Sequence, residues 1–533
     1  VTLTEKLLVP LLAKLTNFVP GGGIWMNTQR PEWNDANNAL VGNGISVVTL
    51  FAVHRDLALL RDLFADAAGA VEVSVEVADL AEAVGGVFER FAPLAERSLD
   101  EAERKEVVDA LGAAGSVYRE QLYRDGLSGG TRTLPQGAIR ALVERALAFV
   151  DHSLRDNRRD DGLVHSYNLL KIRDEGMGVA HLYPMLEGQV AALDAGVLSP
   201  EASLEVLRAL RESAMYRPDQ HSYTLYPDRA LPGFLAKNNV PPEAVEAVPL
   251  FRALLDAGDP SLVVRDVRGG VHFHGAFRNR DDVEAALDGL AERGYAEAVD
   301  RDRQQVLDAF EAVFNHHAYT GRSGTFFGYE GLGSIYWHMV SKLALATQET
   351  VFRAHAEGAA AGTLRRLADA YYDIRAGLGG SKTPEEYGAF PADAYSHTPS
   401  HAGAKQPGMT GQVKEDLLCR WGELGVLVEG GRLVFRPLLL RDEEFLQAPA
   451  SFRYVDVEGR DQVLSLAAGS LGFTVCATPV VYRRADALSI RVVGADGEGT
   501  ALDGAALSRE ASAAVFGRTG SVARIEVHLP PAR

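Results

Sequence analysis

The hydrophobic pattern of the chain changes near residue 445, and this change constrains the fold more than any other feature. Before it, most segments repeat apolar residues at i, i+3, i+4 and i+7, the spacing of one helix face. The clearest such segments are residues 45–64, 80–99, 137–154, 203–215, 282–299 and 333–355. After it, apolar residues alternate and β-branched residues accumulate, as is typical of strands. The pattern predicts a helical catalytic domain, 1–445, and a small antiparallel β-sandwich, 446–533.

The connections between the predicted helices are much longer than the few residues that usually join elements in a compact domain. We expect long loop insertions around residues 85–300. Two further connections, 216–234 and 386–411, are rich in Gly, Pro, His and Tyr. Because long polar loops between packed helices often carry a binding or catalytic site, these stretches are where we expect the chemistry.

Composition excludes several classes of partner. The 533 residues are 47% hydrophobic, enough for a large core, and the formal net charge is −18. Since phosphate neutralisation needs clustered Lys and Arg, and the chain has no such run, neither nucleic acid nor an anionic membrane is an expected partner. An uncharged or small polar ligand fits better. The sequence leaves a homo-oligomer open.

The cysteines and the apolar segments of the chain bear on disulfides, metal sites and cellular location. Cys419 and Cys476 are far apart and show no CxxC spacing, so two buried thiols are expected in place of a disulfide framework or a zinc site. No stretch of about 20 apolar residues predicts a membrane span, and the first residues lack a basic signal sequence. We therefore expect a cytoplasmic protein. The chain begins with Val, so we also expect that an N-terminal part precedes it.

The first polar constellation is TQRPEWNDANNALVGNG, residues 28–44. Trp33 offers a flat apolar face beside the carboxyl group of Asp35. Asn34 and Asn38 add amide donors and acceptors. Such a set can hold a sugar ring, and a carboxyl group beside an aromatic wall is suited to act as a general acid. The alternative is an N-cap cluster that binds the backbone of the following helix.

The second constellation is GRSGTFFGYEGLGSIYWHMVSKLALA, residues 321–346. Glu330 lies in a Gly-rich turn, where the missing side chains allow a ligand to approach the backbone closely. Tyr329 and Trp337 are the aromatic candidates for contacts with a sugar. His338 follows near the start of a predicted helix. The alternative for His338 is a buried structural histidine.

The third constellation, residues 395–418, is a glycine-rich loop running into a predicted helix. Free N–H groups at a helix start can bind an anion or a sugar hydroxyl. The candidate ligand-binding residues are His401, Gln406, Thr410, Gly411 and Gln412. His397 and His401 could instead bind a metal, but no third ligand is evident, so no metal site is predicted. An ordinary hydrogen-bonded loop is the remaining alternative.

Weaker candidates are the stretches 161–189 and 265–282, which mix His, Asp, Arg and Gly. They are interpreted as possible walls of a substrate cleft, the alternative being solvated or packed hairpins. Arg375 is a further candidate partner for an anion or a carboxylate.

Three motifs resemble, in order, those of the inverting glycoside phosphorylases of the cellobiose phosphorylase type and related (α/α)6-barrel glycoside hydrolases. They read EWNDANN, LGSIYWHM and GMTGQVKED. The resemblance covers about residues 20–50 and 320–445. It implies an (α/α)6 barrel, of which this chain could hold only the later part, with Asp35 as proton donor and with His338 and Thr410 beside phosphate. Because the family has a β-sandwich and barrel helices ahead of the first motif, the chain is interpreted as the C-terminal part of a larger protein.

The leading hypothesis is phosphorolysis of a β-linked gluco-oligosaccharide with inversion. Asp35 would protonate the leaving oxygen, and Glu330 would bind sugar hydroxyls. Phosphate, held by His338, His401, Thr410 and Gly411, would be a co-substrate, and no other cofactor is expected. One alternative is an inverting hydrolase in which Glu330 or Asp393 activates water. The other is a carbohydrate-binding protein without catalysis.

Overall fold

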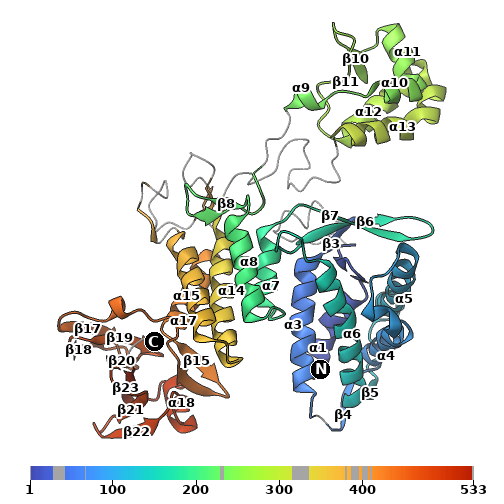
Figure 1. The fold of residues 1–533 in the computed structure, drawn as a ribbon. Coiled ribbons are helices and arrows are strands. Elements are labelled where there is room, and N and C mark those ends of the chain that lie inside the picture. Colours follow the sequence, from blue (N-terminus) through green and yellow to red (C-terminus); the bar gives the residue numbers. More distant parts are fainter. Residues whose placement is uncertain are drawn as a thin grey trace. The chain divides into compact units, whose positions relative to one another are not determined.

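The protein is described by a computed structural model (Figure 1), in which about half of the chain is helical. It describes residues 2–27, 42–66, 68–228, 233–314, 335–378, 381–383, 385, 395–398, 406–407 and 411–530, with the backbone alone at 395–398, 406–407 and 411–413. The chain divides into two compact units. Unit 1 is Val1–Val340 with Gly379–Pro407, and unit 2 is Ser341–Leu378 with Gly408–Arg533.

Helices form most of the N-terminal part of unit 1. They are α1 (Leu3–Leu15), α3 (Val47–Leu63), α4 (Val75–Arg90), α5 (Glu101–Asp125), α6 (Gln136–Asp156), α7 (Leu186–Asp194) and α8 (Pro200–Glu212). Local signals fix several of their starts: the Ser46 hydroxyl accepts a hydrogen bond from the Thr49 N–H, and Asp100 with Glu103 forms a capping box. The four helices predicted between residues 45 and 215 are confirmed.

A five-stranded antiparallel sheet accompanies these helices, and it was not predicted. Its strands, in spatial order, are β1 (Phe18–Val19), β2 (Gly23–Trp25), β3 (Gly44–Ser46), β6 (Tyr167–Ile172) and β7 (Met177–His181). Gly23 has φ 136°, and a Cβ there would lie 2.7 Å from the Ser46 carbonyl oxygen, so only glycine fits. The buried Asn168 amide donates to the Gly22 carbonyl and to the Asn157 side chain, the C-cap of α6, and so connects the sheet to the helix. A separate hairpin pairs β4 (Ala70–Ser74) with β5 (Thr131–Pro135).

Residues 233–314 build a module with a hydrophobic core of its own, called here the inserted module. Its elements are α9 (Phe234–Lys237), α10 (Pro242–Ala247), α11 (Pro249–Ala257), β10 (Val263–Arg265), β11 (Val271–Phe273), α12 (Arg280–Leu290), a π-turn (Ala291–Tyr295) and α13 (Ala296–Phe314). The buried side chains of its core all come from residues 240–314. Aromatic rings dominate that core, the Phe310 centroid lying 4.8 Å from Phe314 and 5.0 Å from Phe273. The helix predicted at 282–299 lies here, broken by Gly294 at φ 101°.

The segments of unit 1 that precede and follow the inserted module are paired with each other. Thr224 follows the hairpin of β8 (Tyr216–Arg217) and β9 (Ser222–Tyr223), and it forms a β-bridge with Ile335. Both residues are fully buried. Ile335 begins β12 (Ile335–Tyr336), which pairs with β13 (Tyr395–Thr398), and β13 pairs with β14 (Gln406–Pro407). The intervening 225–334 is therefore an excursion from one point of unit 1.

Unit 2 contains helices and the C-terminal strands. The helices are α14 (Trp337–Ala356), whose first residues belong to unit 1, α15 (Ala361–Ala376), α17 (Gly411–Glu423) and α18 (Arg509–Phe516). The strands are β15 (Val426–Glu429), β16 (Arg432–Phe435), β17 (Ala450–Val455), β18 (Asp461–Leu466), β19 (Ser470–Val475), β20 (Thr478–Arg484), β21 (Ser489–Gly494), β22 (Gly499–Asp503) and β23 (Val522–Leu529). The strands predicted from residue 446 onward are confirmed, and so is the helix predicted at 333–355.

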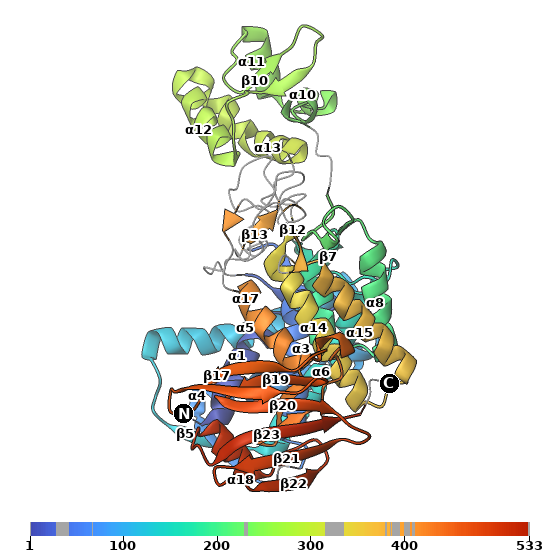
Figure 2. The same cartoon turned by 90° about the vertical axis from the view of Figure 1, so that its left-hand side faces the viewer.

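The predicted antiparallel β-sandwich is wrong in its pairing. The strands form a mixed five-stranded sheet in the order β19-β20-β23-β21-β22, which Figure 2 shows, with β23 parallel to β20. Helix α18, which the alternation did not predict, precedes β23 and provides the long connection that a parallel pair needs. Its Val515 packs into the same core as β23, β15 and β16. In place of a second full sheet, the strands β17 and β18 form a two-stranded hairpin.

Helix length and hydropathy also bear on membrane insertion. Across the described ranges, none of the helices is both long enough and apolar enough to cross a membrane.

Replacing Phe310 by Ala should destabilise the inserted module by about 3–5 kcal/mol, because the change removes a buried ring from the centre of an aromatic cluster. Hydrogen exchange should show lost protection within 233–314 and unchanged protection in α3 and α6. The control is Val267→Ala, at a fully exposed position of the same module. If both variants exchange alike, the aromatic cluster is not the core that holds the module.

Candidate functional site

Most of the predicted site residues lie outside the described residues, and their roles stay predictions. These are Trp33, Asn34, Asp35, Asn38, Tyr329, Glu330, Asp393, His401 and Thr410. Gln406 lies in β14, Gly411 begins α17 and Gln412 follows it, each with the backbone alone described. The side chains of Trp337 and His338 are described, at the junction between β12 and α14.

The junction of β12 with α14 buries two predicted site residues. Trp337 is fully buried and His338 nearly so. The Lys382 ammonium lies 5.1 Å from the centroid of the Trp337 indole and donates a hydrogen bond to the Gln220 carbonyl. This cation–π contact covers one face of the indole ring. Lys382 was not predicted, because a single lysine in a loop is usually solvated.

A polar cluster around β6, β7 and the start of α7 occupies the stretch interpreted as a possible cleft wall. The rings of His165 and His181 stack with centroids 4.0 Å apart. His181 Nδ1 is 2.9 Å from Asn168 Oδ1, and the Tyr167 hydroxyl donates to Glu187 over 2.6 Å. Burial, with a smaller contribution from the neighbouring His181, lowers the pKa of His165 to about 4. Burial also lowers the pKa of His181. Both rings are therefore neutral at neutral pH.

A hollow of about 540 Å³ lies beside the start of the same stretch. Four carboxylates contribute to its lining: Asp160, Asp161, Glu205 and Glu212. Among its described lining residues Arg208 is the one cation, and Leu163 and Pro184 provide apolar surface. Carboxylates accept hydrogen bonds from hydroxyl groups and repel anions, so this lining suits a neutral polyhydroxylated molecule better than phosphate.

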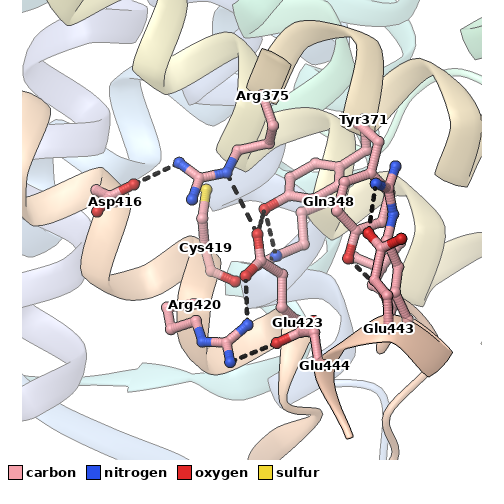
Figure 3. Close-up of polar contacts among 12 residues, drawn as sticks. Gln348, Tyr371, Arg375, Asp416, Cys419, Arg420, Glu423, Glu443 and Glu444 are labelled. Atoms are coloured by element: carbon pink, nitrogen blue, oxygen red, sulfur yellow. Dashed lines mark hydrogen bonds and ion pairs between the residues drawn. The ribbon is translucent and has the colours of Figure 1, made fainter. Parts of the chain in front are cut away.

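In unit 2 a buried carboxylate is surrounded by donors, as Figure 3 shows. Glu423, in the last turn of α17, accepts a hydrogen bond from the Tyr371 hydroxyl over 2.7 Å. Arg420 donates to its other oxygen over 2.9 Å, and Arg375 Nε lies 3.3 Å away. Burial raises the pKa of Tyr371 far above its usual range, so the phenol remains a donor. The arrangement joins α15 to α17.

A second layer extends this network to α14. The Gln348 amide donates to the Cys419 carbonyl over 2.7 Å and to the Tyr371 hydroxyl over 3.3 Å. A Cβ at Gly422 would lie 2.0 Å from Gln348 Oε1, so glycine at this position leaves the room that the Gln348 amide occupies. Burial raises the pKa of the Cys419 thiol to about 12, which keeps it protonated. Of the two thiols predicted to be buried, Cys419 is confirmed, whereas Cys476 is only half-buried.

The anion partners of Arg375 belong to the chain itself. Its guanidinium forms ion pairs with Asp416 and Glu423. Together the two layers hold α17, the helix that begins at Gly411, against α14 and α15. Throughout the described ranges, no group of three His, Cys, Asp or Glu side chains could hold a metal ion.

Comparison with known protein families identifies one part of the chain. A family model described as GH149 phosphorylase insertion domain 2 matches residues 231–317. The match coincides with the inserted module, whose own core and adjacent ends had marked it as an insertion. GH149 is a family of β-1,3-glucan phosphorylases and is distinct from the cellobiose phosphorylase type. Among curated proteins, none matches this chain.

The match indicates a glycoside phosphorylase of carbohydrate metabolism, acting on β-glucosides. The predicted resemblance to glycoside phosphorylases is therefore supported at this level. The specific type that the motifs suggested, cellobiose phosphorylase, is not the one that the module matches.

Replacing Glu423 by Gln should lower the free energy of unfolding of unit 2 by about 3 kcal/mol, because two arginines then lose a buried anionic partner. Chemical denaturation followed by circular dichroism measures the change. Arg436→Gln, which breaks the exposed pair with Glu429, is the control and should cost less than about 1 kcal/mol. Equal losses would show that the Glu423 network does not hold the helices together.

Stability should fall as the pH falls from about 6.5 to about 4, with a contribution from His165. In this window the unfolded histidine binds a proton that the folded one, with its pKa lowered to about 4, does not, so stability rises with pH. His165→Gln should flatten the dependence measured by denaturation at several pH values. The control is His355→Gln, at an exposed position of α14, which should leave the slope unchanged. An unchanged slope in His165→Gln would contradict the assignment.

Proposed function

We propose that this protein is a glycoside phosphorylase that cleaves β-1,3-linked gluco-oligosaccharides with inversion. The observation that carries the proposal is the GH149 phosphorylase insertion domain at residues 231–317. The domain is inserted at one point of unit 1, through the bridge between Thr224 and Ile335. The motif EWNDANN precedes the insertion, and LGSIYWHM and GMTGQVKED follow it. The insertion thus lies between the segments that resemble the acid and phosphate sides of a phosphorylase site.

In the proposed reaction Asp35 donates a proton to the leaving glycosidic oxygen. Phosphate attacks the anomeric carbon from the opposite face, the bond to the leaving oxygen breaks, and an α-configured sugar 1-phosphate forms. The proposed phosphate ligands are His338, His401, Thr410 and Gly411. Glu330 binds sugar hydroxyls near the reacting carbon. The other sugar contacts are assigned to Trp33, Asn34, Asn38, Tyr329, Trp337, Gln406 and Gln412.

We also propose an (α/α)6 barrel as the fold that carries these residues. In an (α/α)6 barrel, loops at one end of the helices converge on a single cavity. We assign this fold to the helical part of the chain because the three motifs resemble those of enzymes with an (α/α)6 barrel. The assignment is supported by the high helical content of the chain and by the mixed sheet at its C-terminal end.

Phosphate dependence separates phosphorolysis from hydrolysis. The protein is incubated with β-1,3-linked gluco-oligosaccharides, with and without phosphate, and sugar 1-phosphate and free glucose are measured separately. We expect sugar 1-phosphate only with phosphate, and little turnover of β-1,4-linked substrates. Release of free sugar without phosphate would instead identify a hydrolase, with Glu330 or Asp393 activating water. Preference for β-1,4 linkages would overturn the assignment of the linkage.

Replacing Asp35 by Asn should lower kcat by at least about 100-fold, because general acid catalysis typically contributes that much or more. The control is Asp56→Asn, at an exposed position of α3, which should keep the wild-type rate. Both variants are compared by melting temperature, so that loss of folding is recognised. Wild-type turnover by Asp35→Asn would remove Asp35 from the acid role.

A further inference from the structure

One face of helix α17 is buried, and two carboxylates lie on it. Its buried residues are Glu415, Cys419, Gly422 and Glu423. Their spacing of i, i+4, i+7 and i+8 places them on one side of a helix. Lys414 and Asp416, the neighbours of Glu415, are exposed. Glu415 is therefore an interior residue and does not belong to the solvated face that the sequence KED suggests.

The two carboxylates differ sharply in their partners. Glu423 accepts hydrogen bonds from Tyr371 and Arg420. Glu415 is 3% exposed, and its Oε2 has no hydrogen-bond partner among the described residues. Its Oε1 lies 3.7 Å from the ammonium of Lys414, a side chain that is 67% exposed.

Glu415 is also exceptional among the buried acids of the described part of the chain. The others each accept at least one hydrogen bond: Glu5, Glu76, Glu187, Asp302, Glu423 and Glu526. Burying a carboxylate without such partners is costly, and functional sites are where proteins retain groups of this kind. A bound molecule that donates a hydrogen bond would remove the cost.

The position of Glu415 indicates where that molecule binds. Glu415 follows Gly411, the first residue of α17, by one helical turn. Side chains of an α-helix tilt toward its N-terminus, so the carboxyl group lies over the first turn. The N–H groups of that turn have no partner within the helix and attract an oxygen acceptor. A ligand that accepts from these N–H groups and donates to Glu415 must carry both an acceptor oxygen and a hydroxyl group.

We propose that Glu415 accepts a hydrogen bond from a substrate hydroxyl group bound at the first turn of α17. This rests on the proposed function, in which two substrates carry such a group: phosphate through its P–OH, and the glucan through a sugar hydroxyl. Glu415 thereby binds and orients the substrate. Glu423, on the same face and roughly 12 Å further along the helix axis, holds the helix in place.

The test compares Glu415→Gln with Glu423→Gln in the full chain. Glu415→Gln keeps the shape of the side chain and removes its charge. We expect it to raise the KM for one of the two substrates about tenfold, since hydrogen bonds to charged groups are of that strength. Its melting temperature should equal or exceed that of the wild type, because an unpaired buried charge is removed. Glu423→Gln should lower the melting temperature instead.

The substrate whose KM rises is the one that donates the hydrogen bond to Glu415. A rise in the KM for phosphate alone identifies phosphate as the donor, and a rise in the KM for the oligosaccharide identifies the glucan. Unchanged KM values for both substrates would overturn the proposal. So would a melting temperature that falls in Glu415→Gln as it does in Glu423→Gln, which would make Glu415 a structural residue.

If the proposed function itself is wrong, the wild-type protein forms no sugar 1-phosphate, which distinguishes this outcome from a wrong role for Glu415. The role of Glu415 is still decided by ligand binding in that case. Phosphate and a β-1,3-linked gluco-oligosaccharide are each added to the wild type and to Glu415→Gln. A rise of melting temperature seen in the wild type and lost in the variant supports the proposal, and equal rises, or none in either protein, overturn it.

Discussion

The backbone pairing of Thr224 with Ile335 is the contact on which the organisation of unit 1 depends. It holds the two ends of the segment 225–334 together at one buried point. The inserted module within this segment has an aromatic core of its own. The entropic cost of closing a loop grows slowly with its length, so an insertion of this size is tolerated once its ends are held. The same pairing connects, through β12 and β13, the hairpin at Tyr216 with the segment that leads to α14.

The fold was predictable where local pattern decides it. The helices α6 and α14 carry an apolar face over many turns, and their periodicity indicated them directly. The sheet of unit 1 was missed because β1 and β2 have too few residues for alternation to be visible, and its order is fixed by distant contacts such as the Asn168 amide. In the C-terminal sheet the strands were found, but alternation along a strand does not say whether its neighbour runs parallel, as β20 and β23 do.

The candidate site was predictable only as an ordered set of motifs. Their order around the GH149 insertion supports the assignment to glycoside phosphorylases, whereas the contact of Asp35 with a sugar stays a prediction. Glu415 and Glu423 were missed because charged residues on a helix usually face solvent. Their burial follows from the packing of α17, which Gly422 and Gln348 make possible. The cation beside Trp337 likewise comes from a distant loop.

We propose that this chain transfers a glucosyl group from a β-1,3 linkage to phosphate with inversion. Nuclear magnetic resonance of the reaction with a β-1,3-linked gluco-oligosaccharide and phosphate tests it most directly, because it reads both the new bond and its anomeric configuration. We expect a glucose 1-phosphate in the α configuration from the first turnovers. A β-configured sugar phosphate would contradict inversion, and free glucose with unchanged phosphate would contradict phosphorolysis.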